Sequence, residues 1–206
     1  MDDHFIFEIE NNISEDICKQ IIRRFENDPF KEQSKIGTTI DGEGSIDLRR
    51  RNSKEICISP KKEWNDIDKI LKDALGEGIK LYRKEIEKKI KVVGEDPHFL
   101  LGDCLMQGVS DHGYIVQRVE KDSWFRWHHD SSYNHQILTV IWYLNTMDIS
   151  NGGRTEFISG RKVLPKVGKL LIFPSTWTNL HCGSWVKNQY KYICTTGIYT
   201  NRVKDF

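Results

Sequence analysis

The sequence predicts one α+β domain in which helices precede an all-β jelly roll or sandwich. Apolar residues recur at helical spacing through much of the first half of the chain. From about residue 113 the pattern changes to β-branched and aromatic runs divided by Gly, Pro, Asn and Asp. A length of 206 residues is enough for one full core and short for two. We therefore expect a single domain, mainly helical with a long loop over 1–112 and all-β over 113–206.

The N-terminal part should begin with an extended segment and a short helix. Residues 5–9 read as extended, and Ser14 can cap a helix whose apolar positions follow the 3.6-residue period and which should end before Pro29. Residues 31–53 are rich in Gly, Asp, Ser and Thr without a sustained period, which indicates a long loop, and such loops often serve as lids. The three arginines at 49–51 are typical of a solvated loop, with a substrate-contacting patch as the alternative.

A second helical pattern runs from about residue 61 to residue 91. Its apolar residues form one stripe, which Gly76 and Gly78 interrupt, so the segment can hold either one helix or two. Candidate strands follow at 114–119, 125–130, 136–145, 154–158, 162–164, 169–173 and 190–200. The 136–145 run is apolar on both faces, as expected for a strand with an opposing sheet on one side and helices on the other.

Composition and charge disfavour several classes of protein. The longest uncharged apolar runs are far shorter than the roughly 20 residues of a membrane span. The formal charge is only +1, so no strongly basic surface indicates a nucleic-acid partner. Acidic residues open the sequence without the apolar segment of a secretory signal, and the five cysteines have no CxxC spacing. We therefore expect a cytoplasmic protein in a reducing compartment, without a membrane span.

His128, Asp130 and His181 are the candidate metal ligands. His128 and Asp130 fall at the end of a candidate strand, where alternate side chains point to the same side and can grip one ion. One His-x-acid pair is expected by chance in such a chain, but His181 follows a strand-then-turn pattern and can complete the set. Two imidazoles and one carboxylate leave coordination positions open, which is typical of non-haem iron(II) oxygenases. A closed zinc site would need a fourth ligand, and we read the adjacent Cys182 as a packing residue.

Lys191 is the candidate anion-binding residue. It lies ten residues beyond His181, in a strand flanked by aromatic residues that otherwise looks buried. The ordinary reading of a strand lysine is a side chain that extends to solvent. Near a metal site, an inward-pointing lysine needs an anion, and the distal carboxylate of 2-oxoglutarate is the better partner.

Several segments of the second half share their order and spacing with one enzyme family. They are Trp127-His128-His129-Asp130, Trp142-Tyr143-Leu144-Asn145, Gly152-Gly153-Arg154-Thr155-Glu156-Phe157, the run from Pro165 to Pro174, and His181 with Lys191. Through them, residues 114–200 resemble the catalytic core of the prolyl 4-hydroxylase-like branch of the iron(II)/2-oxoglutarate-dependent oxygenases.

The resemblance implies a fold, a set of ligands and a reaction. The fold is a double-stranded β-helix with supporting N-terminal helices. Iron(II) is bound by His128, Asp130 and His181, and Lys191 pairs with the far carboxylate of 2-oxoglutarate. The implied reaction is hydroxylation of a peptidyl or small-molecule substrate by dioxygen, with release of succinate and CO2. Ascorbate is an expected reductant.

Two departures from the family pattern bear on the substrate. Val119 stands where the family often has a Tyr that contacts the co-substrate, and Gly197 stands where it often has a Trp near the substrate. Both changes argue against a collagen-like peptide. The first shifts the expected co-substrate contacts to Thr155 or Tyr114.

Other functions and substrates stay open from the sequence. One alternative is a β-helix binding module without turnover, and another is a cupin-like metal enzyme without an oxo-acid co-substrate. A peptidyl proline, a free amino acid and a modified nucleotide all fit as substrate. The aromatic residues Trp124, Phe125, Tyr133 and Trp177 either line a pocket mouth or merely pack, and we favour packing.

Overall fold

The computed structural model describes residues 5–36, 44–92, 94–96, 105, 109–131 and 136–200. Its main helices are α1 (Glu15–Asn27) and α2 (Asn65–Val92). Three short 3-10 helices are also present: η1 (Lys62–Trp64) directly before α2, η3 (Ile149–Asn151) between β7 and β8, and η4 (Trp177–Asn179) between β10 and β11. The strands are β1 (Phe7–Ile9), β2 (Glu32–Gln33), β3 (Ser53–Cys57), β4 (Val109–Asp111), β5 (Ile115–Val119), β6 (Ser123–His128), β7 (Gln136–Tyr143), β8 (Thr155–Phe157), β9 (Lys162–Val163), β10 (Leu170–Pro174), β11 (His181–Val186) and β12 (Lys191–Thr200).

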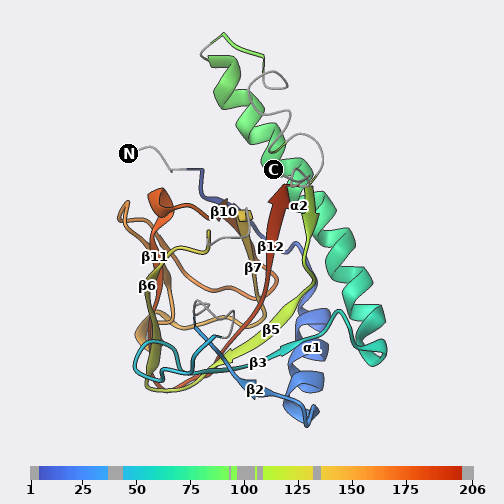
Figure 1. The fold of residues 1–206 in the computed structure, drawn as a ribbon, viewed down its shortest axis with the longest axis vertical. Coiled ribbons are helices and arrows are strands. Elements are labelled where there is room, and N and C mark those ends of the chain that lie inside the picture. The colour runs from blue at the N-terminus through green and yellow to red at the C-terminus, as the bar shows by residue number, and fades with distance from the viewer. Residues whose placement is uncertain are drawn as a thin grey trace.

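The strands form two antiparallel sheets that face each other. The larger sheet has the order β1-β10-β7-β12-β5-β3-β2, with β4 paired to β12, and the smaller sheet has the order β6-β11-β8-β9. Figure 1 shows β6 and β11 on one side, the larger sheet in the middle, and both helices on the far side of the larger sheet. This arrangement confirms the expected α+β class, with a jelly-roll core and helices that support one face.

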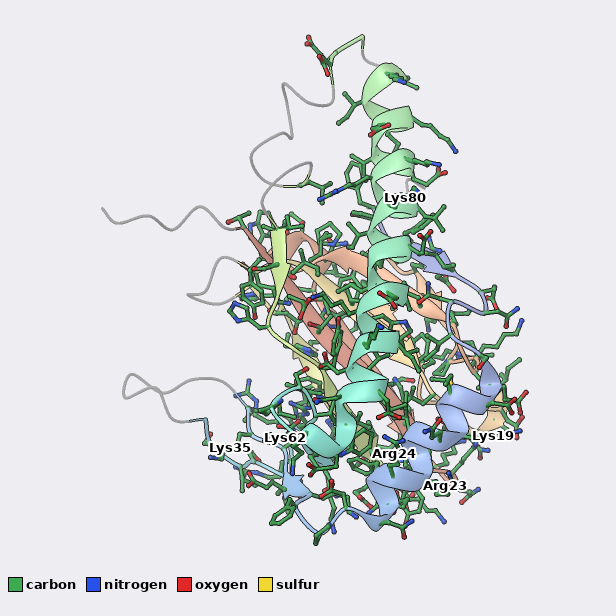
Figure 2. The ribbon with its side chains drawn as sticks, turned by 90° about the vertical axis from the view of Figure 1, so that its right-hand side faces the viewer. Lys19, Arg23, Arg24, Lys35, Lys62 and Lys80 are labelled. Atoms are coloured by element: carbon green, nitrogen blue, oxygen red, sulfur yellow. The ribbon has the colours of Figure 1, made fainter. Side chains whose placement is uncertain are left out.

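Helix α1 starts and ends where the sequence predicts. The Ser14 side chain accepts a hydrogen bond from the backbone N–H of Ile17 at 3.3 Å, which caps the helix, and the helix ends at Asn27, ahead of Pro29. Arg24 joins α1 to the start of α2 through a two-pronged contact with the Asp66 carboxylate, at 2.7 and 2.6 Å. The two helices therefore lie against the sheet as one connected layer (Figure 2).

Helix α2 is a single helix of 28 residues that continues through Gly76 and Gly78. The sequence left open whether this segment held one helix or two, and packing explains why the glycines do not break it. A Cβ at Gly78 would overlap the Cδ2 atom of Leu170 on β10, whereas a Cβ at Gly76 would meet nothing within 4 Å. Gly78 thus lets the helix axis approach the sheet closely.

The core has two layers, which strand alternation separates. Leu170 and Ile172 of β10 point toward the helices, while Leu171 and Phe173 point between the sheets. The same alternation divides β7, which explains why both strands are apolar on both faces. The layer between the sheets is the smaller of the two clusters, and this leaves room there for a cavity.

Parts of the predicted organisation need correction. The predicted loop at 31–53 contains β2, a bridge between Ile36 and Ser45, and the first residue of β3, while its residues 37–43 lie outside the described part of the chain. The sequence patterns also did not give β3, β4 or β11. These strands are short or rich in polar residues, so their periodicity is weak.

Over the described residues, no helix combines the length and apolar character that a membrane crossing requires.

Candidate active site

Three predicted ligands converge at one end of the smaller sheet. His128 closes β6 and His181 opens β11, and these two residues are directly paired across the two strands. Asp130 lies two residues beyond β6, with its Oδ1 3.4 Å from His128 Nε2 and its Oδ2 3.5 Å from His181 Nε2. One ligand atom from each residue lies within 4.8 Å of the other two. The strand pairing, and not only the local spacing, therefore brings the set together.

Hydrogen bonds to the backbone orient both imidazoles. His128 Nδ1 lies 2.7 Å from the carbonyl oxygen of Arg126, and His181 Nδ1 lies 3.1 Å from that of Asn179. Because a carbonyl oxygen only accepts, each Nδ1 donates the hydrogen bond, and each Nε2 is turned toward Asp130. Burial lowers the pKa of His181 to about 4, a shift that the Asp130 charge only partly opposes, so this ring is neutral at pH 7.

Asp130 supplies a fixed negative charge. Burial alone would raise its pKa, but His128, His181 and the Thr139 hydroxyl together hold the pKa well below the usual value. Its backbone N–H donates to the carbonyl oxygen of Ser175 at 3.1 Å. Two imidazoles and one carboxylate form a set with open positions, which suits iron(II). The residues present therefore fit this metal.

A cavity of about 290 Å³ between the sheets contains this set at one part of its wall. Lys191, the first residue of β12, lines the same cavity and is only 4% exposed. Burial lowers the pKa of Lys191 to about 8. No hydrogen bond or ion pair to its ammonium is found among the described residues, and the ring of Tyr143 lies 5.5 Å from Nζ. A buried cation of this kind needs an anionic ligand.

Comparison with known proteins decides what this cavity belongs to. Residues 114–199 match the model of the 2OG-Fe(II) oxygenase superfamily, and this segment contains the three candidate metal ligands and Lys191. Residues 114–199 form the core of a 2OG-Fe(II) oxygenase. The family expected from the sequence is thereby confirmed. The protein is an oxidoreductase, and iron(II) and 2-oxoglutarate are the metal and co-substrate that its core implies. No curated protein matches the chain by sequence.

Solved prolyl hydroxylases share the fold of this oxygenase. A viral collagen prolyl hydroxylase from Paramecium Bursaria Chlorella virus-1, solved with 2OG, has a TM-score of 0.67 at 16% identity, and 97% of each chain is covered. A Trichoplax adhaerens prolyl hydroxylase, solved with a hypoxia inducible factor peptide fragment, has a TM-score of 0.74 at 14% identity, over 99% of this chain and 89% of that one. A Pseudomonas putida prolyl-4-hydroxylase has a TM-score of 0.62 at 14% identity, over 96% and 94% of the two chains. At these identities the likeness concerns the fold, and it confirms the double-stranded β-helix.

The two further co-substrate contacts expected from the sequence fall on different sides of the oxygenase core. Thr155 of β8 is buried and lines the cavity, and its hydroxyl is 2.7 Å from the Tyr143 hydroxyl. Tyr114 instead lies in the cluster between the larger sheet and the helices, edge-on to Trp142 at 5.9 Å. Its neighbour Ile115 lines the cavity, so alternation along the chain turns Tyr114 away from it. Tyr114 is therefore not among the proposed contacts.

Tyr143 was not singled out from the sequence, although it belongs to a segment that carries the family resemblance. It is fully buried between the sheets, and it touches both the Lys191 ammonium and the Thr155 hydroxyl. Burial keeps the pKa of Tyr143 well above its usual value, so the hydroxyl stays protonated. It thus places a neutral hydroxyl beside Thr155 and its ring beside Lys191, behind these two lining residues of the cavity.

Arg51 also lines the cavity, which corrects the solvated-loop reading of residues 49–51. Its guanidinium lies 4.8 Å from the Phe125 ring, and this ring stacks on His128 at 3.7 Å. It also donates to the Glu55 carboxylate at 2.9 Å. Arg49 and Arg50 are exposed, as a solvated loop predicts. One arginine of the run therefore contacts the wall that carries the metal set.

The aromatic residues expected near the mouth divide into two groups. Trp124 and Phe125 line the cavity, so the packing reading is wrong for them. Trp177 is 72% exposed and is not among the lining residues, and Tyr133 lies outside the described residues. Both departures from the family pattern, at 119 and 197, are also positions of the cavity wall.

Proposed function

We propose that this oxygenase hydroxylates a side chain of a peptide, with a prolyl residue as the first candidate. The observation that carries the co-substrate part of the proposal is the buried Lys191 ammonium, which shares one cavity with the His128, Asp130 and His181 set. A cation and an open metal site in one cavity match the two ends of a 2-oxo dicarboxylic acid. The same observation disfavours a metal enzyme without an oxo-acid co-substrate.

Each residue has a separate task in the proposed reaction. His128, Asp130 and His181 hold iron(II), while Lys191 binds the far carboxylate of 2-oxoglutarate, and Thr155 stands beside it as a hydroxyl contact. The bound metal supplies the activation of dioxygen, which converts 2-oxoglutarate to succinate and CO2 and places one oxygen atom in a C–H bond of the substrate. The apolar side chains of Ile141 and Ile193 in the wall exclude water.

The size of the cavity supports a peptide substrate. At about 290 Å³ it is at the lower end of the roughly 300–1,000 Å³ range of ligand pockets. Once 2-oxoglutarate is bound, the space left suits one side chain better than a whole second molecule. Trp124, in the wall, contacts Trp185 at 4.5 Å and offers an aromatic surface to the rest of a peptide. Several solved structures with this fold are named as prolyl hydroxylases.

Succinate release tests the activity. The protein is mixed with iron(II), 2-oxoglutarate, oxygen and a library of prolyl peptides, and succinate and peptide mass are followed. We expect succinate in excess of a no-enzyme control and a gain of one oxygen atom on a peptide. Succinate without any hydroxylated peptide would remove the peptide proposal but keep the reaction class. No succinate from protein that binds iron(II) and 2-oxoglutarate would favour the binding-module alternative.

The lysine assignment has its own test. Anaerobic addition of 2-oxoglutarate to the iron(II) protein should give the weak visible charge-transfer band of the chelate. The Lys191→Met variant keeps the length of the side chain and removes the charge, so the band should need at least about 30-fold more 2-oxoglutarate, because an unpaired buried charge costs about 2–5 kcal/mol. Lys162→Met, an exposed lysine on β9, is the matched control. Absence of the band in the metal-loaded wild type would remove the co-substrate assignment.

Three further expectations are part of the proposal. We propose that residues 1–206 act as one oxygenase domain, in which the 1–112 part supports the 113–206 core through the helix-side cluster. A cytoplasmic location agrees with the free thiols of Cys18, Cys57, Cys182 and Cys194. Ascorbate as a reductant rests on the family resemblance, and a rise in the number of turnovers on its addition would support it.

A further inference from the structure

We infer that Thr139 is a positioning residue for the Asp130 carboxylate, and that Gln136 and Tyr199 hold Thr139 in its donating orientation. The inference rests on the proposed function, because it requires Asp130 to be a metal ligand. Thr139 lies on β7 of the larger sheet, and its hydroxyl donates to Asp130 Oδ2 at 2.5 Å. The metal set therefore has one of its outer contacts on the opposite sheet.

The direction of the hydrogen bonds follows from groups that can only accept or only donate. Gln136 Nε2 lies 3.3 Å from the carbonyl oxygen of Leu138, so this end of the amide must be the NH2 group. The other end, Oε1, then accepts from the Tyr199 hydroxyl at 3.0 Å. Gln136 Nε2 also donates to Thr139 Oγ1 at 3.1 Å. The hydrogen bonds from Tyr199 to Gln136, from Gln136 to Thr139 and from Thr139 to Asp130 therefore all run in the same direction, toward the carboxylate.

Ser175 closes the network on its buried side. Its hydroxyl is 2.9 Å from Thr139 Oγ1 and 3.1 Å from Gln136 Nε2, and its carbonyl oxygen accepts from the Asp130 backbone N–H. Since the single Thr139 hydrogen is used on Asp130, Ser175 donates to Thr139. Thr139 and Ser175 are 6% and 1% exposed, so water competes little for these bonds.

Because Gly197 has no side chain, there is room beside it for the Gln136 and Tyr199 side chains of this hydrogen-bond network. A Cβ there would lie 2.7 Å from Gln136 Cδ and 2.8 Å from a ring carbon of Tyr199. The position where the family often has a Trp is thus occupied by the Gln136 and Tyr199 contact. His112 stacks on the Tyr199 ring at 3.8 Å and fixes its plane. The absence of a side chain at Gly197 is therefore what allows Gln136 and Tyr199 to form their hydrogen bond.

Metal affinity is the readout that separates positioning from simple packing. Cobalt(II) is titrated into wild-type protein and the Thr139→Val variant, which keeps the shape and loses the hydroxyl, and visible absorption is followed. We expect about 10–100-fold weaker cobalt(II) binding for Thr139→Val, as for other groups that orient metal ligands, with an altered spectrum. Thr139→Ser, which keeps the hydroxyl, should bind within about threefold of the wild type. Thr195→Val, another cavity threonine whose hydroxyl meets Gln117, is the control and should match the wild type.

Gly197→Ala provides a second route that leaves Thr139 untouched. Its methyl group should displace the Gln136 amide and weaken cobalt(II) binding several-fold, and it decides the matter if Thr139→Val does not fold. Wild-type affinity in the folded Thr139→Val variant, or in Gly197→Ala in that case, would overturn the inference while leaving the proposed function intact. Wild-type protein that binds no cobalt(II) would overturn both.

Discussion

At the scale of single residues, the Lys191 ammonium makes co-substrate binding depend on pH. Its pKa of about 8 means that it is charged below pH 8 and loses its charge above that value. Because 2-oxoglutarate binds the charged form, its dissociation constant should be flat below pH 8 and rise up to tenfold per pH unit above it. Calorimetric titration of the manganese(II)-loaded protein between pH 6.5 and 9.5 measures this. Lys191→Arg keeps its charge throughout, so an equal rise in that variant would refute the assignment.

At the residue scale, the sequence predicted which side chains lie together where a motif fixes the geometry, and the roles of these side chains stay a proposal. Asp130 follows His128 at the end of one strand, and the predicted convergence of both with His181 is present in the structure. Lys191 is buried beside the same cavity, as its setting in an apolar strand suggested. The expected co-substrate contact of Tyr114 does not agree with its position on the helix side of the larger sheet, because the sequence around β5 does not tell which of two alternating faces points into the cavity. Its direction depends on which face of the larger sheet the helices cover.

At the scale of elements, the two glycines of α2 should respond in opposite ways to the same substitution. Gly76→Ala should stabilise the protein by about 0.5–1 kcal/mol, since it gains helix propensity and meets nothing within 4 Å. Gly78→Ala should destabilise it by about 1–3 kcal/mol, because the methyl group overlaps Leu170, which is fully buried and has little room to move. Urea unfolding followed by circular dichroism measures both. Changes of the same sign would contradict the packing described for α2.

The N-cap of α1 allows a second test at this scale. Removing the Ser14 hydroxyl in Ser14→Ala leaves the Ile17 N–H without its side-chain acceptor and should cost about 1 kcal/mol of the free energy of unfolding. Ser14→Asp restores an acceptor and should recover most of the loss. The same urea unfolding experiment provides the values, and an unchanged midpoint for Ser14→Ala would show that the cap contributes nothing.

Elements were predictable where their periodicity is strong. Helices α1 and α2 and the apolar strands β7 and β10 all appear near their expected positions. Strand β3 reads Ser-Lys-Glu-Ile-Cys, and only its pairing with β5 makes it a strand. Such pairing joins residues about 60 positions apart, as Ile56 with Val116, and no local window contains that information.

At the scale of the whole molecule, the proposed ligands join the two sheets. The two candidate histidine ligands belong to the smaller sheet and Asp130 follows its strand β6, whereas Lys191 starts a central strand of the larger sheet. Manganese(II) and 2-oxoglutarate at 100 times their dissociation constants should each add about 2.7 kcal/mol, or roughly 5–10 °C in Tm. Differential scanning fluorimetry should show the 2-oxoglutarate part lost in Lys191→Met and both parts lost in His181→Ala. A full 2-oxoglutarate shift in Lys191→Met would place the co-substrate elsewhere.

The contacts that sequence reasoning missed are those between residues that are far apart in the sequence. Thr139 meets Ser175, Gln136 meets Tyr199, and Arg51 meets Phe125, each across a long stretch of chain. Their residue types are ordinary for a strand or a loop, so nothing local marks them. Strand pairing within the larger sheet brings the first two pairs together, and the third pair joins the segment before β3 to β6 of the smaller sheet, so all three contacts depend on the complete fold.

The absence of a side chain at Gly197 also limits the order in which the protein can change over evolution. Any larger residue at 197 collides with the Gln136 amide, while shortening residue 136 first leaves a gap that a new side chain can fill. We therefore expect the two positions to show epistasis, with the Gln136→Ala and Gly197→Ala double variant less impaired than Gly197→Ala alone. An ancestor with a bulky aromatic residue at 197 would have reached the present pair through a small residue at 136.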